Sequence, residues 1–216
     1  VLFRSLCRTY PNWIAQESAR GTEFESFNGI RPDHQTILPF TRLMGGPMDY
    51  TPGIFEGDLS VYGSNKAKLG TTLVKQLALY VTMYSPLQMA ADLYQNYEKY
   101  PDAFQFIKDV AVDWDHTYIL EAEPGDYITI ARKAKGKNEW YIGGITDENS
   151  REALIDFSFL PKGKKYQAVI YADGKKADWR TNPKEYVIET RTVSHKTKLR
   201  QKLAPSGGVA ISIKEL

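Results

Sequence analysis

The sequence predicts a mixed fold, with an α/β part over residues 1–115 and an antiparallel all-β part over residues 116–216. The first part follows the order strand, loop, strand, loop and helices, which is typical of βα units with long loops. The second part contains short β-rich runs separated by polar turns. The charge balance also changes: residues 1–120 hold 10 Lys and Arg against 13 Asp and Glu, whereas residues 121–216 hold 18 against 13. We therefore expect two regions with different surfaces.

Two strands and two loops are expected before the helices. Residues 8–17 should form a short extended segment, because Pro11 favours extended geometry at the residue before it. Residues 18–36 are polar and interrupted by glycine and proline, so we expect a long loop, which in a compact domain is usually functional or disordered. Residues 37–44 are predicted to be a buried strand. The strand ends at Gly45-Gly46-Pro47 and continues as a turn-rich loop to residue 56.

Helices are predicted after residue 69. Apolar side chains recur with helical spacing at Leu73, Leu77, Tyr80, Val81 and Tyr84, which indicates an amphipathic helix with one apolar stripe. Pro86 ends this helix or begins a second one, which would extend to about residue 100. A third, short helix is expected after residue 102.

The remaining chain is predicted to be an antiparallel sandwich or barrel. Short strands at this spacing, separated by turns such as 123–125, 161–163 and 173–174, are typical of such folds. We expect the boundary between the two parts near residues 113–118. The β-rich runs cover residues 126–134, 139–146, 152–159, 166–173, 185–193 and 208–216.

Composition limits the classes of function. Hydrophobic residues make up 42% and charged residues 25%, as in a globular protein, and the net charge of +2 is too small to indicate a nucleic-acid or membrane partner. No apolar run approaches the ~18 residues of a membrane helix. Cys7 is the single cysteine, so an intrachain disulfide is excluded. Because the sequence starts at Val1, we expect it to be a piece of a longer protein.

The segment "QESARGTEFE" places Glu17, Glu23 and Glu25 around Arg20 and Gly21. Like charges this close need compensation, and three explanations remain open. The carboxylates could bind a hard cation such as Ca²⁺ through oxygen ligands. One of them could donate a proton to a leaving oxygen, if its surroundings raise its pKa. All three could instead form a solvated loop edge. A (β/α)₈ barrel builds its site at the ends of its strands, where Glu17 would lie, but spacing alone favours the solvated loop edge.

Other candidate residues carry weaker signals. His34 is either a ligand or sugar contact, or a structural histidine. Asp49 could bond sugar hydroxyls or cap the turn after Pro47, and Trp13 or Tyr50 could stack on a sugar ring or fill the core. The basic tract 195–202 is best explained as a strand with a solvated face. Phosphate-loop, CxxC, HExxH and GxSxG motifs are absent from the sequence.

Three long stretches, in the same order, resemble glycoside hydrolase family 97: "RTYPNWIAQESARGTEFE", "HQTILPFTRLMGGPMDYTPGIFE" and "QLALYVTMYSPLQMAADLYQNYE". Within the family, the likeness is to the calcium-dependent α-glucosidases of Bacteroides starch utilisation. It extends from Arg8 to the C-terminus, whereas residues 1–7 do not resemble the family. It implies a C-terminal part of a catalytic (β/α)₈ (TIM) barrel, followed by an antiparallel β-sandwich domain.

The resemblance also implies roles for two glutamates. The family's general acid falls on Glu23 and its calcium ligand on Glu17, and Glu23 is a candidate second ligand because the acid lies beside the ion. Arg20 would pair with a ligand carboxylate, and Glu25 is expected to be solvated. Ca²⁺ would then offset the crowded negative charges, while Glu23 must be protonated when an oligosaccharide binds.

The resemblance implies that this chain is incomplete. The base, or the nucleophile of retaining members, and at least one calcium ligand would lie in the missing N-terminal part of the same protein. We therefore expect the chain alone to be inactive. With an unpaired strand edge and apolar helix faces exposed, it should aggregate or bind a partner. The expected function is an exo-acting, inverting, periplasmic α-glucosidase. The alternatives are a retaining α-galactosidase of the same family, or a non-catalytic carbohydrate-binding module in residues 116–216.

Overall fold

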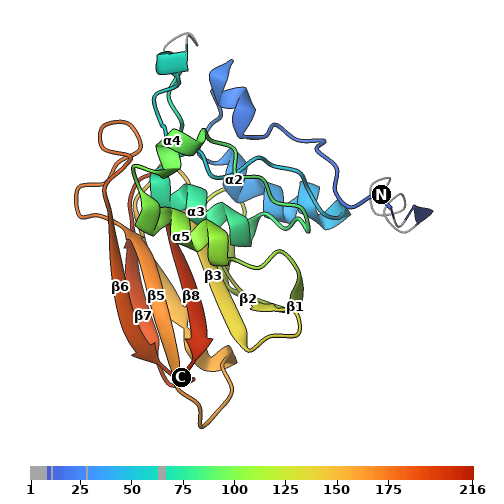
Figure 1. The fold of residues 1–216 in the computed structure, drawn as a ribbon, viewed down its shortest axis with the longest axis vertical. Helices are drawn as coiled ribbons and strands as arrows, with labels where there is room; N and C mark the ends of the chain where they lie inside the picture. Colours follow the sequence, from blue (N-terminus) through green and yellow to red (C-terminus); the bar gives the residue numbers. More distant parts are fainter. Residues whose placement is uncertain (1–8, 11, 28, 63–66) are drawn as a thin grey trace.

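The computed structural model describes residues 9–10, 12–27, 29–62 and 67–216. The expectations for residues 1–7, including Cys7, and for Pro11 lie outside these residues. In the described part, a β-rich C-terminal half carries short helices and loops from the first hundred residues on one side (Figure 1).

Eight strands form the C-terminal half. Six of them make one antiparallel sheet in the order β1-β2-β3-β8-β5-β6, and β4 pairs with β7 in a second, two-stranded sheet. The strands are β1 (Trp114–Glu123), β2 (Tyr127–Ala134), β3 (Glu139–Thr146), β4 (Arg151–Asp156), β5 (Tyr166–Asp173), β6 (Tyr186–Val193), β7 (Lys198–Leu203) and β8 (Gly208–Glu215). The antiparallel β domain predicted from the sequence is confirmed. The strand β1 was not predicted, and β7 corresponds to the basic tract assigned to a strand with a solvated face.

The inner strands of the six-stranded sheet are buried on both faces, as β3 and β8 show. In β3, Trp140 and Ile142 belong to a core shared with β4 and β7, whereas Tyr141 and Ile145 belong to a second core shared with the helices. Successive side chains of a strand point to opposite faces, so a strand covered on both sides reads as a nearly continuous apolar run. This explains why β3 and β8 were easy to recognise in the sequence.

Two helices cover one face of this sheet: α3 (Leu73–Thr82) and α5 (Pro101–Asp109) (Figure 1). The helix α3 begins at Thr72, whose side chain accepts a hydrogen bond from the Lys75 backbone N–H, and all ten of its residues are buried. Pro101 occupies the first turn of α5, where its missing N–H costs nothing. The first and third predicted helices are therefore confirmed. The second is wrong, because only α4 (Tyr94–Tyr97) is helical between residues 86 and 100.

The strands predicted before residue 69 are wrong. Residues 37–44 belong instead to the end of α2 (His34–Ile37) and to the 3₁₀ helices η2 (Leu38–Phe40) and η3 (Arg42–Gly45). Pro39 lies in the first turn of η2 and has no N–H for a sheet ladder. The other short helices are η1 (Thr22–Ser26), η4 (Leu59–Tyr62) and η5 (Phe157–Phe159).

A barrel is not present in the described chain. Two neighbouring strands were expected before Trp114. Among the described residues of that part, a single parallel bridge between Gln16 and Met48 stands in their place. A strand needs a partner for its backbone N–H and C=O groups, and these two segments meet at that single point. The TIM-barrel part of the predicted fold class is therefore wrong for this chain.

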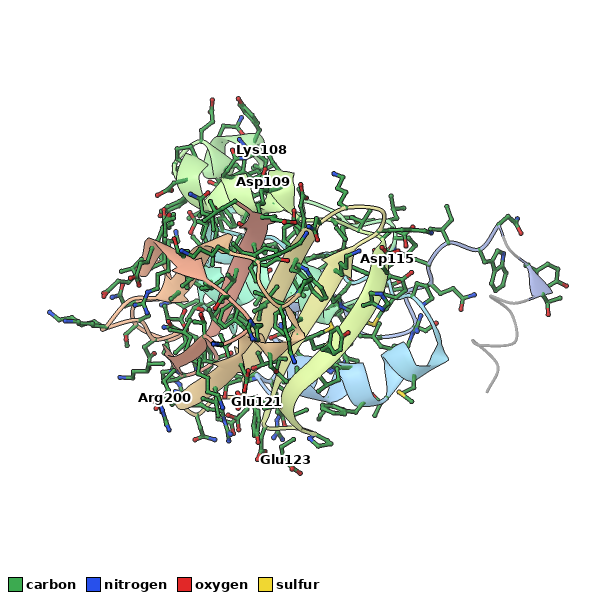
Figure 2. All side chains as sticks on the ribbon, turned by 90° about the horizontal axis from the view of Figure 1, so that it is seen from below. Lys108, Asp109, Asp115, Glu121, Glu123 and Arg200 are labelled. Carbon is green, nitrogen blue, oxygen red and sulfur yellow. The ribbon has the colours of Figure 1, made fainter. Side chains whose placement is uncertain are left out.

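The edge strand β1 carries charged side chains. Asp115 lies toward one end of β1, and Glu121 and Glu123 lie toward the other (Figure 2). An exposed edge presents unpaired backbone groups to other chains, and charges on it disfavour edge-to-edge pairing. The sequence of β1 thus limits association along this edge.

Gly143 lies where α3 approaches β3. A Cβ atom at this position would lie 2.6 Å from the Ala78 carbonyl oxygen and 2.8 Å from the Val81 Cβ. Since the nearest atom is helix backbone, it cannot move aside as a flexible side chain could. We expect Gly143→Ala to destabilise the chain by about 1–3 kcal/mol, the usual cost of overpacking.

The urea midpoint of the Gly143→Ala variant, measured by pulse proteolysis at low protein concentration, checks this prediction. Gly57→Ala is the control, because a Cβ there would meet Pro183 Cγ at an ordinary 3.7 Å. Equal midpoints for the two variants would contradict the close packing of α3 on β3.

Candidate functional site

Two backbone segments come together at the predicted carboxylates. The Gln16 N–H donates to the Pro47 carbonyl at 3.4 Å, and the Asp49 N–H donates to the Gln16 carbonyl at 3.0 Å. Glu17 and Asp49 each follow this contact directly. The structure therefore brings Asp49, a weak candidate in the sequence, to the same place as Glu17.

Arg42 holds both segments. Its guanidinium donates to the carbonyls of Gln16 at 2.6 Å, Glu17 at 3.0 Å, Gly46 at 3.1 Å and Pro47 at 3.1 Å. The side chain is buried, and four carbonyl acceptors compensate for part of its lost hydration. Arg42 was expected inside a strand, with no role of its own. Two of its four acceptors, the Gln16 and Glu17 carbonyls, lie 26 and 25 residues away in the sequence, so no local pattern indicated that it joins the two segments.

The carboxyl of Glu23 folds back over Gly21. A Cβ at Gly21 would collide with Glu23 Oε2 and lie 2.8 Å from Oε1, so a larger residue at this position would displace the carboxyl. The Thr51 hydroxyl hydrogen-bonds Glu23 Oε2 and also accepts from the Thr22 N–H at 3.1 Å. Glu23 lies in η1, which starts at Thr22. These contacts fix the position of the carboxyl that the sequence assigned as the acid.

Glu17, Glu23 and Asp49 interact electrostatically. The pKa of Glu17 is raised, first because its carboxyl shares a hydrogen bond with the Glu23 carboxyl, then by burial and by the negative charges of Glu23 and Asp49. A second negative charge beside Glu23 and Asp49 is therefore disfavoured at Glu17, and a bound cation would offset this crowding.

Backbone strain occurs beside these carboxylates. Among the described residues, the non-glycine positions with positive φ are Ser18 (54°), Thr51 (63°) and Ser206 (47°). Ser18 follows Glu17, and Thr51 contacts Glu23. Such conformations cost free energy and are concentrated at functional sites, so they support a functional role for this region.

The expectation that Glu25 is solvated is wrong. Glu25 is 1% exposed, and its carboxylate accepts hydrogen bonds from the Ile30 N–H at 2.9 Å and the Gly70 N–H at 3.3 Å. Burial raises its pKa, whereas these two N–H groups and the charge of Lys75 lower it. Glu23 and Glu25 lie on the same short helix but in different environments. The explanation that all three glutamates form a solvated loop edge is therefore wrong for Glu25.

The other candidates have mainly structural contacts. A ring nitrogen of His34 lies 2.9 Å from the Arg20 carbonyl oxygen, and both residues line an open hollow of about 480 Å³ next to Ile30. Trp13 is exposed and packs on Tyr10 with ring centroids 5.7 Å apart. Tyr50 is buried, so it is not available as a sugar platform.

Arg20 does not pair with a ligand carboxylate in the described contacts. Its guanidinium lies over the Phe24 ring, 5.8 Å from the centroid. The role that the resemblance implied for Arg20 stays a prediction.

The site offers part of a calcium coordination sphere. Ca²⁺ takes 6–8 oxygen ligands, and Glu17 and Glu23 provide adjacent carboxylates whose shared hydrogen bond a cation could replace. Within the residues that the structure describes, no group of three or more His, Cys, Asp or Glu side chains is arranged to hold a metal. The carboxylate chemistry fits a hard cation, and the remaining ligands would have to come from outside these residues.

A buried lysine lies beneath the site and was not identified from the sequence. Lys75 is 0% exposed, and its Nζ donates to the carbonyls of Thr146 at 2.8 Å and Pro32 at 3.1 Å and to Ser206 Oγ at 3.1 Å. Burial lowers its pKa to about 7, against the opposing effect of Asp147 and other carboxylates. In the sequence, Lys75 is one polar residue in an apolar helix, which gives no sign of burial.

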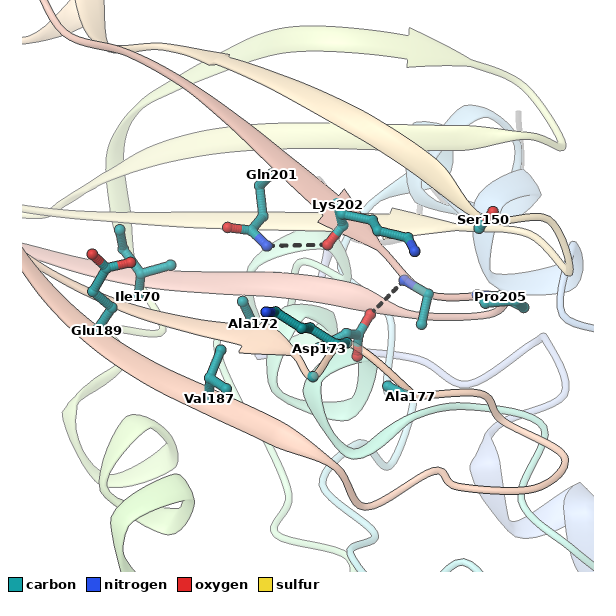
Figure 3. Close-up of a pocket in the computed structure, with 13 residues that line it drawn as sticks. Ser150, Ile170, Ala172, Asp173, Ala177, Val187, Glu189, Gln201, Lys202 and Pro205 are labelled. Atoms are coloured by element: carbon teal, nitrogen blue, oxygen red, sulfur yellow. Dashed lines mark hydrogen bonds between the residues drawn. The ribbon is translucent and has the colours of Figure 1, made fainter.

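A second hollow, of about 480 Å³, lies in the β domain between β5, β6 and β7 (Figure 3). Asp173 at its base accepts from the Ala204 N–H at 2.9 Å. The described residues that line it include no aromatic ring: Ser150, Ile170, Ala172, Asp173, Gly174, Lys175, Ala177, Val187, Glu189, Gln201, Lys202, Ala204 and Pro205. Sugar-binding surfaces use aromatic faces, so this hollow does not favour the carbohydrate-binding module.

Residues 113–214 match a protein family described as "Glycosyl-hydrolase 97 C-terminal, oligomerisation". Two curated relatives are similar to the chain. A retaining alpha-galactosidase of Bacteroides thetaiotaomicron is 37% identical over 97% of this chain and 32% of its own length. A probable retaining alpha-galactosidase of Streptomyces bingchenggensis is 32% identical over 65% of this chain and 20% of its own length. The chain therefore spans a third or less of the curated relatives it matches.

Solved structures give a higher similarity. A glycoside hydrolase family 97 enzyme from Pseudoalteromonas sp. strain K8, described in complexes with panose and with acarbose, is 50% identical to this chain. The alignment covers 98% of this chain and 33% of the enzyme, with a TM-score of 0.93. The described helices include none long and apolar enough to cross a membrane.

Proposed function

Because this chain belongs to glycoside hydrolase family 97, we propose that it is the C-terminal part of a calcium-dependent, exo-acting α-glucosidase. In this proposal Glu23 is the general acid, and Glu17 and Glu23 hold the cation. The substrates are starch-derived oligosaccharides, and the missing N-terminal part of the protein supplies the base and the other cation ligands.

The contact between Glu17 and Glu23 is the observation that carries this proposal. The Glu23 and Asp49 carboxylates raise the pKa of Glu17, so negative charge is crowded at this point, and a cation bound between Glu17 and Glu23 would offset it. The Thr51 hydroxyl and Gly21 fix the Glu23 carboxyl, so the proton can be delivered in a defined direction. A bound cation would supply charge compensation and orient the substrate.

The inverting mechanism depends on the partner of Glu23. In inverting glycosidases the base stands ~6.5–9.5 Å from the acid, which leaves room for a water molecule, whereas a nucleophile in a retaining enzyme stands at ~5–5.5 Å. That partner lies outside this chain. The 37% identity between this chain and a retaining alpha-galactosidase favours the second candidate, a retaining α-galactosidase. The 50% identity to an enzyme that binds panose, a glucose trisaccharide, favours the first.

The isolated chain is proposed to be inactive. Several large apolar side chains of the first part are exposed: Trp13 at 42%, Ile14 at 55% and Met44 at 72%. The missing part of the catalytic barrel would cover such a surface, and without it the chain should aggregate. A periplasmic location is part of the same proposal and rests on the family resemblance.

Hydrolysis of p-nitrophenyl α-glucoside and α-galactoside by the full-length protein tests the substrate. We expect turnover of the glucoside, loss of activity in EGTA, and recovery when Ca²⁺ but not Mg²⁺ is added back. Preferred turnover of the galactoside would establish the second candidate. Full activity in EGTA, after extended dialysis, would contradict the calcium requirement.

A further inference from the structure

We infer that Lys75 is a positioning residue for the candidate acid loop, and that it connects this loop to the β domain through Ser206, Gly70 and Glu25. The inference rests on the proposed function, because it assigns a role to the loop that carries Glu23. It also assigns a role to residues 113–216, whose contacts with Lys75 would help to hold Glu23 in place.

The connection consists of three consecutive hydrogen bonds and one turn of the short helix η1. Lys75 Nζ donates to Ser206 Oγ at 3.1 Å, and Ser206 Oγ donates to the Gly70 carbonyl at 2.6 Å. The Gly70 N–H then donates to Glu25 Oε1 at 3.3 Å. Glu25 lies in η1 with Glu23, two residues along the chain. The contacts therefore run from the interior of α3 to the helix that presents the acid.

The two ends of this connection come from different parts of the fold. Ser206 lies in the turn between β7 and β8, and its N–H donates to the Asp147 carbonyl at 2.7 Å while its carbonyl accepts from the Thr72 N–H at 3.1 Å. Lys75 also donates to the Thr146 carbonyl at the end of β3. On the other side it donates to the Pro32 carbonyl, in the loop that follows η1. The Lys75 ammonium group thus links the end of β3 and the turn at Ser206 to the loop that follows η1.

The surroundings of Lys75 compensate only part of the cost of burying its charge. The carboxylates of Asp147, Glu25, Asp173 and Asp33 attract the ammonium group, but the loss of hydration on burial outweighs them. A buried charge is costly to desolvate, and it rarely increases stability over a well-packed apolar core. Such groups are retained when they fix one arrangement of the chain. The positive φ of Ser206 agrees with this, since the turn is held in a conformation that serine rarely adopts.

Kinetics with two leaving groups test the inference in the full-length enzyme. General acid assistance matters for a poor leaving group, such as the alkoxide oxygen of a second sugar, and matters little for fluoride. We expect Lys75→Met to lower kcat for an α-linked oligosaccharide by roughly 10-fold, a part of the roughly 10²–10⁴-fold that general acid catalysis contributes, with an unchanged KM and nearly unchanged turnover of the α-glycosyl fluoride. Ser206→Ala keeps a small side chain at this turn. It should lower the leaving-group ratio, which is kcat on the oligosaccharide divided by kcat on the fluoride, by a smaller factor than Lys75→Met does.

Backbone amide hydrogen exchange gives a second readout that does not depend on activity. Lys75→Met and Ser206→Ala should accelerate exchange at the Gly70 and Ile30 amides, because Glu25 would no longer be held against them. Phe106→Ala is the control. It destabilises the helices that cover the sheet without touching the contacts of Lys75 and Ser206, so it should leave the leaving-group ratio unchanged.

Equal losses on both substrates, or unchanged exchange at Gly70 and Ile30, would overturn the role of Lys75. The proposed function is judged separately by Glu23→Gln. If Glu23→Gln itself shows no dependence on the leaving group, Glu23 is not the acid, and the positioning role is overturned together with it.

Discussion

Replacing Glu23 by glutamine in the full-length enzyme is expected to lower kcat on an α-linked oligosaccharide by roughly 10²–10⁴-fold, the contribution of general acid catalysis. Glutamine keeps the shape of the side chain and an oxygen for the Thr51 hydroxyl, but it cannot donate a carboxylic proton. Turnover of the corresponding α-glycosyl fluoride should fall far less, because fluoride leaves without full protonation. Steady-state kinetics on both substrates measure the effect.

Glu98→Gln is the matched control, since Glu98 is an exposed residue at the end of α4. It should leave kcat on both substrates unchanged. A Glu23→Gln variant with full activity on the oligosaccharide would remove Glu23 from the mechanism. Its contacts with Glu17 and Thr51 would then have to be explained as structure or cation binding alone.

Replacing Phe106 by alanine is expected to destabilise the chain by about 3–5 kcal/mol, the range for deleting a fully buried aromatic side chain. Phe106 is 0% exposed in α5 and packs edge-on against Tyr171 of β5 and Tyr141 of β3, with ring centroids 5.3 Å and 6.3 Å apart. The loss removes both buried apolar area and these ring contacts. The urea midpoint from pulse proteolysis measures the change.

Leu154→Ala is the control for this measurement, because Leu154 on β4 is 43% exposed. Substitutions at such surface positions usually change stability by less than about 0.5 kcal/mol. A Phe106→Ala variant with the midpoint of the unaltered chain would show that α5 does not contribute to the core of the sheet.

The C-terminal half was predictable because its information is local. Strands β2, β3, β5 and β8 are short apolar runs between polar turns, and the helix α3 has an apolar stripe with helical spacing. The first part was predicted poorly for the opposite reason. Residues 37–44 are apolar enough for a strand, but a strand forms only where another strand pairs with it, and here η2 and η3 satisfy the backbone locally.

The candidate site was predicted in part. Glu17 and Glu23 came from a family resemblance, and the structure brings their carboxyls into contact. Glu25 was expected to be solvated because no role was assigned to it, yet it is buried against Gly70. Arg42 and Lys75 were missed, since they have partners that lie far away in the sequence: Gln16 and Glu17 for Arg42, and Thr146 and Ser206 for Lys75.

The sequence by itself determined the alternation of strands and turns after residue 126, the helix α3, and the family to which the chain belongs. Each of these is recorded in neighbouring residues or in long motifs. Only the tertiary structure decided which charges are buried, which backbone segments Arg42 holds together, and how Lys75 connects η1 to the turn at Ser206. The physical reason is that burial and ion pairing depend on distances in space. A lysine or glutamate has the same local pattern whether water or a ring of carbonyl groups surrounds it.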